Sequence, residues 1–151
     1  QTKTLLPVIL LLVPILSHAQ ALKSQPTNEN GNKIYSGKVS LTGSYHLETD
    51  SYDGKFDGLH FYPDDKSIAL LPEETLNSAG ASSILLRNKN NSLRLFKLNP
   101  KQLRKGECYE GDKVTVTIEN YIYSPISWGW RSANLISVKD MSKPKIVKCN
   151  P

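Results

Sequence analysis

The sequence contains two cysteines in 151 residues, which is too few for a disulfide-dense small domain or a four-cysteine zinc site. Three short catalytic signatures are missing: the G-x-S-x-G serine elbow, the phosphate-binding P-loop and the H-E-x-x-H zinc motif. The two cysteines are far apart, so the C-x-x-C spacing of a redox motif is missing as well. Active sites can assemble from residues distant in sequence, but these absences favour a protein without catalysis and predict no cofactor.

Long hydrophobic runs are also lacking. The apolar run at residues 5–16 is shorter than the about 20 residues that a membrane-spanning helix needs. Lys3 precedes this run, and Ala19 and Ala21 follow it, which is the arrangement of a secretory signal. A buried core helix is the alternative, but two prolines lie inside the run. The sequence therefore predicts a signal peptide at residues 1–21, a periplasmic or secreted location, and no transmembrane span in the mature chain.

No stretch has the period of a long amphipathic helix, and the dominant pattern is instead alternation of apolar and polar residues. The clearest alternation is at residues 38–48, where Gly43 interrupts the apolar row as at a β-bulge. The five main strands are expected at residues 38–48, 59–62, 92–98, 113–121 and 133–139. Residues 72–76 are expected to form one helical turn, residues 146–149 form a candidate edge strand, and residues 84–86 fit either a strand or a buried loop.

Five short strands joined by Gly-, Asp-, Asn- and Pro-rich connections predict a mainly β fold, a small five-stranded OB-like barrel with one short helical turn. A sandwich of two sheets is the competing architecture, although it usually has about seven strands. The barrel domain is expected at residues 36–151. Residues 22–35 are polar and rich in asparagine, so they are expected to form a flexible lead-in.

The first two expected strands allow one geometric test. If they pair as an antiparallel hairpin, Tyr45 lies opposite Phe61 on a buried face, and His46 lies opposite His60 on the outer face. Glu48 is then beside the two histidines. Two imidazoles and a carboxylate can hold zinc with an open position, so these residues form a candidate metal site. The sequence favours the alternative, which is two exposed histidines without a metal.

Four segments carry a resemblance to a known class of protein. They lie at residues 37–43, 95–100, 111–116 and 133–138, in that order along the chain. In pattern the chain resembles secreted bacterial domains of unknown function that have an OB-like barrel. The resemblance implies a periplasmic or secreted binding module with no known chemistry.

Cys108 and Cys149 are expected to form a disulfide bond. The predicted signal peptide sends the chain to an oxidising compartment, where paired thiols become bonded. Such a bond would tie the C-terminal tail to the start of the strand at residues 113–121. Two free thiols are the alternative.

The most distinctive segment is residues 121–131, which hold both tryptophans of the chain. Its candidate ligand- or partner-binding residues are Tyr121, Tyr123, Trp128, Trp130 and Arg131. Aromatic planes stack on sugars or bases, arginine adds hydrogen bonds, and both residue types are common anchors of protein interfaces. In the alternative interpretation, Trp128 and Trp130 close one end of the barrel.

Charge is distributed unevenly along the chain. Residues 22–86 hold 5 basic and 9 acidic residues, whereas residues 87–151 hold 13 basic and 5 acidic residues. A basic second half can attract an anionic partner, or it can simply be a solvated face. Together these patterns predict a non-enzymatic exported protein of the bacterial envelope that binds a protein or glycan partner; nucleic acid is not the expected partner. The alternatives are a toxin-neutralising immunity protein, a small secreted metal-dependent hydrolase built on the two histidines, and a purely structural envelope protein.

Overall fold

The structure is a computed structural model that describes residues 2–5, 7, 9, 21–49, 56–76 and 83–149. The predicted signal peptide at residues 1–21 lies largely outside the described residues and stays a prediction. Among the residues that are described, no helix is long and apolar enough to span a membrane.

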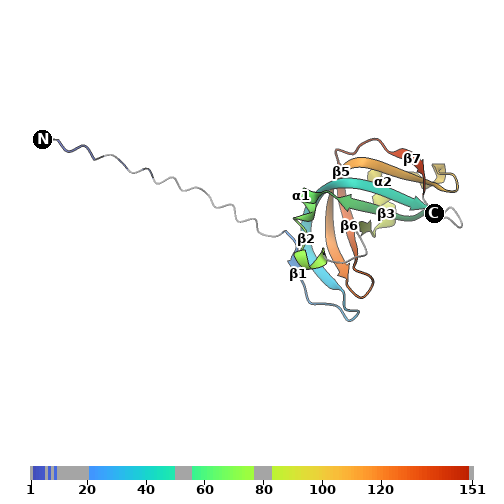
Figure 1. Ribbon diagram of the computed structural model, residues 1–151, viewed down its shortest axis with the longest axis horizontal. Helices are drawn as coiled ribbons and strands as arrows, with labels where there is room; N and C mark the ends of the chain where they lie inside the picture. Colours follow the sequence, from blue (N-terminus) through green and yellow to red (C-terminus); the bar gives the residue numbers. More distant parts are fainter. Residues whose placement is uncertain are drawn as a thin grey trace.

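The chain folds mainly as β-strands (Figure 1). The strands are β1 (Lys23–Ser24), β2 (Lys33–Thr49), β3 (Phe56–Pro63), β4 (Ile84–Leu86), β5 (Glu107–Ser124), β6 (Trp130–Lys139) and β7 (Lys145–Lys148). The helices are the α-helices α1 (Asp65–Ile68) and α2 (Lys89–Phe96) and the 3-10 helices η1 (Glu73–Thr75) and η2 (Pro100–Gln102). The mainly β prediction is confirmed, and η1 is the helical turn expected at residues 72–76.

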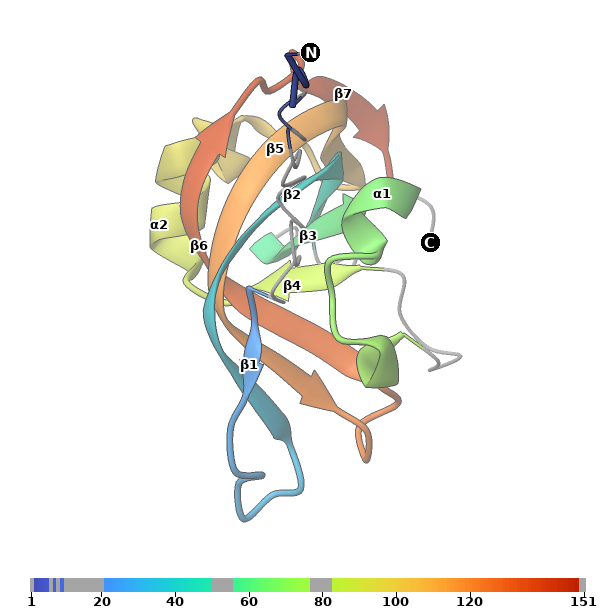
Figure 2. The same ribbon diagram turned by 90° about the vertical axis from the view of Figure 1, so that its left-hand side faces the viewer.

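Within the described part of the chain, five strands form a ring in the order β2–β3–β4–β6–β5, and pairing of β5 with β2 completes it (Figure 2). β4 and β6 run parallel, and the other neighbours in the ring are antiparallel. β1 pairs with the first part of β2, and β7 pairs with the first part of β5. The long strands β2 and β5 therefore pair with every other strand of the sheet except β4.

Alternation of side chains accounts for the core inside this ring. In β2, residues 39, 41, 43, 45, 47 and 49 are all buried, and each residue between them is more exposed. The strand pairing predicted from this alternation is confirmed, because Tyr45 pairs with Phe61 and His46 pairs with His60. Leu41, Val114 and Val116 are also buried in the same core cluster, so β2 and β5 share one interior.

The strand predicted at residues 92–98 is wrong, because most of this segment forms helix α2. Ser92 and Phe96, four residues apart, are its buried side chains, and the helix ends at Lys97 in the left-handed conformation. Asn88 attaches the start of the helix to β6: its side chain accepts a hydrogen bond from the Leu135 amide at 2.9 Å and donates one to the Leu135 carbonyl at 3.0 Å. Leu93 and Leu95, which precede Phe96, are half-buried in the helix, so the sequence of this segment only resembles that of a two-sided strand.

The segment at residues 22–35, expected to be a flexible lead-in, contributes β1 and the first residues of β2. Leu22 and Tyr35 within it are buried in the core. The polar residues between them form the turn of the β1–β2 hairpin, so the polar composition of this segment belongs to a folded turn and not to a flexible one. Residues 84–86, which fitted two alternatives, are strand β4.

Gly43 marks the bulge expected from its place in the apolar row: the register of β2 against β5 shifts between Gly43 and Tyr45. A Cβ atom at Gly43 would lie 1.9 Å from the carbonyl oxygen of Tyr62, so any side chain there would push β3 away. We expect Gly43→Ala to lower the free energy of unfolding by about 2–3 kcal/mol, as overpacking does. Urea unfolding measures this. The neighbouring outward-facing variant Ser44→Ala is the control, and equal stability of the two variants would contradict the close approach.

Candidate functional site

The segment at residues 124–130, called here the aromatic loop, connects β5 to β6. The amides of Ser127 and Gly129 both donate to the carbonyl of Ser124 at 3.1 Å, and the Trp130 amide donates to the carbonyl of Ser127 at 3.2 Å. This compact turn places Trp128 at φ 60° and Gly129 at φ 72°. Glycine adopts such angles freely, whereas a bulky residue such as Trp128 does so at a cost.

The aromatic loop exposes its large side chains instead of burying them. Trp128 is 83% exposed, Ile126 is 78% exposed and Trp130 is 55% exposed. The alternative in which the two tryptophans close the barrel end is therefore wrong. Ile126 was not among the residues predicted from the sequence. Its position beside Pro125 in a segment with no strand alternation is the signal that could have indicated an exposed turn.

A second turn, at residues 28–32 of the β1–β2 hairpin, lies against the aromatic loop. A Cβ atom at Gly31 would lie 2.8 Å from Cδ1 of Ile126, so this isoleucine rests on the glycine backbone. The side chain of Asn28 holds the turn, because its Oδ1 accepts hydrogen bonds from the amides of Asn30 and Asn32. The two turns lie at the same end of the molecule, as Figures 1 and 2 show. They form one surface, with apolar side chains from one turn and asparagines from the other.

The other three residues predicted for this site point into the core. Tyr121 is fully buried, Tyr123 is 8% exposed and Arg131 is 6% exposed. The reason is alternation: β5 and β6 turn these residues inward and their neighbours Ile122 and Trp130 outward. The structure thus brings Trp128 and Trp130 together on the surface and separates them from the two tyrosines and Arg131.

Tyr121 belongs to a buried polar network beneath η1. Its hydroxyl lies 2.9 Å from Oγ1 of Thr75, and that hydroxyl donates to the carbonyl of Pro72 at 2.7 Å. The ring of Tyr35 packs against that of Tyr121 at 5.6 Å between centroids, and the Tyr35 hydroxyl donates to Oε1 of Glu74 at 2.7 Å. The network holds η1 on the core, so it has a structural role. Nε of Arg131 is buried here without a hydrogen-bond partner among the described residues.

Burial raises the pKa of Tyr35, Tyr45 and Tyr121 above the ordinary value of 10.0. For Tyr35 the hydrogen bond to Glu74 raises the pKa further, and the same bond lowers the pKa of the Glu74 carboxyl. For Tyr121 the Thr75 hydroxyl and Arg131 partly offset the effect of burial. The neutral phenols are therefore the form that the folded core holds.

These raised pKa values predict that stability is lost in alkali. Well below pH 10 the tyrosines are protonated in both the folded and the unfolded chain. As the pH rises through 10 the unfolded chain releases protons that the folded core retains, so the free energy of unfolding falls. We expect tyrosinate absorbance to rise cooperatively above pH 10, together with loss of the near-ultraviolet circular dichroism. Gradual ionisation of these tyrosines near pH 10 in an intact fold would be the opposite result.

The histidine cluster predicted from the hairpin register does assemble on the outer face. Nε2 of His46 lies 4.0 Å from Oε1 of Glu48, and Nε2 of His60 lies 3.9 Å from Oε2 of the same carboxylate. Nδ1 of His60 lies 3.1 Å from Oγ of Ser83, a partner that the sequence did not indicate. Tetrahedral zinc would hold ligand atoms about 3.4 Å apart, which is shorter than both of the distances between the histidine nitrogens and the Glu48 carboxylate. In the described segments, no group of three or more His, Cys, Asp or Glu residues could hold a metal ion.

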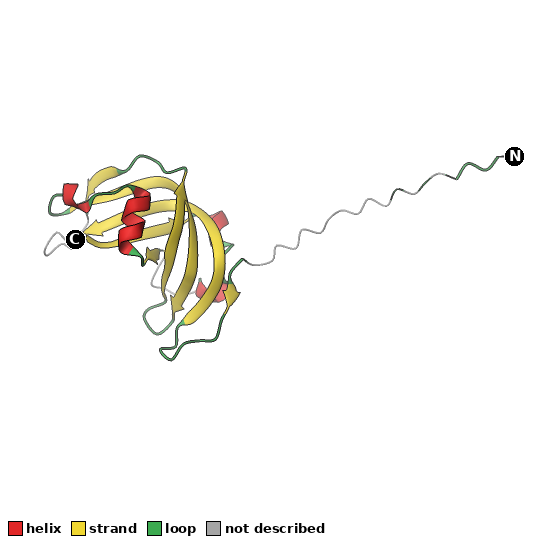
Figure 3. Ribbon diagram, turned by 180° about the vertical axis from the view of Figure 1, so that it is seen from behind, coloured by secondary structure: helices red, strands yellow, loops and turns green. Residues whose placement is uncertain are grey.

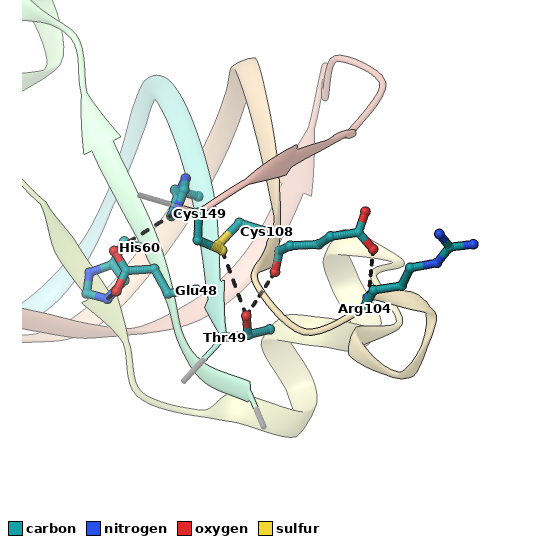
Figure 4. Close-up of a disulfide and its surroundings, with 8 residues drawn as sticks. Glu48, Thr49, His60, Arg104, Cys108 and Cys149 are labelled. Carbon is teal, nitrogen blue, oxygen red and sulfur yellow. Dashed lines mark hydrogen bonds and ion pairs between the residues drawn. A yellow bond between two sulfur atoms is a disulfide. The ribbon is translucent and has the colours of Figure 1, made fainter. Parts of the chain in front are cut away.

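The predicted disulfide between Cys108 and Cys149 is present, with 5.3 Å between the Cα atoms (Figure 4). Cys108 is fully buried. Thr49 lies beside the bond: its hydroxyl donates to the carbonyl of Glu107 at 2.9 Å and lies 3.8 Å from Sγ of Cys149. The bond fixes β7 and the segment after it to the start of β5.

Comparison of the chain with protein-family models, curated proteins and solved structures found no match.

Proposed function

We propose that the chain is a non-enzymatic exported protein of the bacterial envelope, an OB-like barrel that binds a protein or glycan partner through the aromatic loop. The binding side chains are Ile126, Trp128 and Trp130, with the asparagine turn at residues 28–32 beside them. Tyr121, Tyr123 and Arg131 support the loop from the core instead of contacting the partner.

The barrel assignment is supported by strand order. The ring strands are, in chain order, β2, β3, β4, β5 and β6. Around the ring, the first strand is followed by the second, the third, the fifth and the fourth, and the fourth pairs with the first. Helix α2 falls between the third and fourth of them. A five-stranded Greek-key ring of this kind is what an OB-like barrel has, and the loop between its fourth and fifth strands is one of the usual ligand-binding loops. The aromatic loop occupies that place.

The observation that carries the proposal is the state of Trp128, which is both exposed and in the left-handed conformation. A non-glycine residue in that region costs about 1–2 kcal/mol, and an exposed indole gains little from burial. Fold stability alone would favour glycine or asparagine at this position. Strain of this kind is retained at positions that serve binding.

Export is supported by the predicted signal peptide and by the Cys108–Cys149 disulfide, since such bonds persist in oxidising compartments. The histidine cluster around Glu48 belongs to β2 and β3, whereas the aromatic loop joins β5 and β6. It has no part in the proposed surface.

Partner capture from envelope extract tests the proposal. The double variant Trp128→Ala/Trp130→Ala should lose a partner that the unaltered protein retains. Each tryptophan is expected to contribute about 30-fold in affinity, the effect of an interface hot spot of about 2 kcal/mol. The matched control is Leu70→Ala/Ile146→Ala, which removes two other side chains that are each 49% exposed. Equal recovery of the partner by the tryptophan variant and the control would contradict the assignment of the aromatic loop as the binding site.

A further inference from the structure

A second surface is rich in basic residues. Residues 87–105 contain seven basic residues and no acidic residue. We call these residues the basic ridge: Arg87, Lys89, Arg94, Lys97, Lys101, Arg104 and Lys105. All seven are exposed. Such a run of one sign produces a strong local potential on a domain whose overall charge is modest.

The apolar side chains between the ridge residues point into the core, and the basic side chains therefore point outward. In α2, Ser92 and Phe96 are buried, whereas Arg94 and Lys97 point to solvent. Leu98, beyond the helix, is buried as well, and Leu103 packs against the core from the turn after η2. Figure 3 shows α2 lying on the outside of the strands. The cations are therefore presented on a segment that is anchored to the core by Phe96, Leu98 and Leu103.

At least three of the ridge cations have no counter-charge in the described part of the chain. Among the described residues, the side chains of Arg94, Lys101 and Lys105 form no ion pair with a carboxylate. Arg94 donates instead to the side chain of Asn91. Glu107 is the nearest acidic residue along the chain, and its carboxylate accepts a hydrogen bond from the Arg104 amide at 2.7 Å, which uses the backbone and not the guanidinium.

We propose that the basic ridge docks on an anionic lipid surface. Each basic residue near such a surface contributes about 1 kcal/mol, so the exposed cations of α2, η2 and the turns beside them act together. Single-stranded nucleic acid is less suited to the ridge, because its bases stack on aromatic side chains that lie among the cations, and Phe96, the aromatic residue of this segment, is fully buried. The inference rests on the proposed export, which brings the protein to a membrane surface, but not on the aromatic loop.

Vesicle binding tests the inference with variants that separate the two surfaces. The ridge variant is Arg94→Glu/Lys101→Glu/Lys105→Glu, and the charge-matched control is Lys139→Glu/Lys143→Glu/Lys148→Glu, whose lysines are also exposed. The probe is phosphatidylcholine vesicles with and without phosphatidylglycerol, in a flotation assay at low and physiological salt. Circular dichroism establishes that each variant is folded.

We expect the unaltered protein to bind only the vesicles that contain phosphatidylglycerol, and to bind them less well as salt increases. The ridge variant should bind at least about 100-fold more weakly, which corresponds to three contributions of about 1 kcal/mol. The control variant and Trp128→Ala/Trp130→Ala should bind normally. Equal loss in the control would overturn the ridge, because net charge alone would then explain binding. Binding to single-stranded DNA in place of vesicles would overturn the choice of lipid, and loss in the tryptophan variant alone would assign the membrane contact to the aromatic loop.

Discussion

Replacing Cys108 and Cys149 by alanine is expected to lower the free energy of unfolding by about 4 kcal/mol. The bond closes a segment with a sequence separation of 41 residues, and the chain-entropy model gives about this value for a loop of that length. Alanine is the suitable replacement because Cys108 is fully buried, and a serine hydroxyl at this position would be buried away from water. Among the described strands β7 pairs only with β5, so we expect it to separate first.

Urea unfolding under oxidising and reducing conditions measures this effect. The unaltered protein should become as unstable as the double variant when a reducing agent is added, and the variant should not respond to the reducing agent. The single variant Ile146→Ala, on the exposed side of β7, is the control for a simple loss of side-chain contacts there. Identical unfolding curves for the oxidised and reduced protein would contradict a stabilising role for the bond.

Phe96→Ala is expected to lower the free energy of unfolding by about 3–5 kcal/mol, the usual cost of truncating a buried phenylalanine. Phe96 is fully buried, and its ring meets that of Tyr45 edge-on at 5.0 Å between centroids. This contact attaches α2 to β2 across the core. Loss of the ring would therefore leave a cavity and loosen the element that carries the basic ridge.

The control for this prediction is Leu95→Ala, the half-buried neighbour on the same helix. It should cost clearly less than Phe96→Ala in thermal or urea unfolding. If the two variants were equally stable, the helix would not be anchored as described, and the strand interpretation of this segment would regain support.

The alternation of apolar and polar side chains predicts several of the strands in this chain. It predicts the pairing of Tyr45 with Phe61 and of His46 with His60 in the β2–β3 hairpin, because the apolar rows of the two strands must share the buried face. The same alternation locates half of β5 and most of β6. These elements are predictable because each one buries one face and exposes the other.

The sequence does not predict helix α2, because the local pattern of this segment is that of a strand whereas its tertiary contacts belong to a helix. Leu93, Leu95 and the buried Phe96 form a short apolar run like that of a strand. A contact that attaches the start of the helix is remote in sequence: the side chain of Asn88 forms hydrogen bonds with the backbone of Leu135. No local period reveals a contact of that kind. The lead-in was misjudged for a similar reason, since Leu22 is buried by a sheet formed elsewhere in the chain.

The candidate site was predicted in part. The sequence indicates the aromatic loop, because both tryptophans lie between two strands, but it does not tell which aromatic residues face outward. That depends on strand register and on where the turn begins at Ser124. The contact between Ile126 and Gly31 joins turns far apart in the chain and could not be predicted from either segment alone.

The measurement that tests the central claim most directly compares stability and binding in Trp128→Gly. Glycine adopts the observed φ of 60° without strain, so the variant should unfold at the same temperature or higher, gaining up to about 1 kcal/mol. It should also lose partner affinity by about 30-fold. A variant that unfolds several degrees lower, or that binds its partner as well as the unaltered protein, would contradict the proposal that Trp128 is kept in the loop for binding.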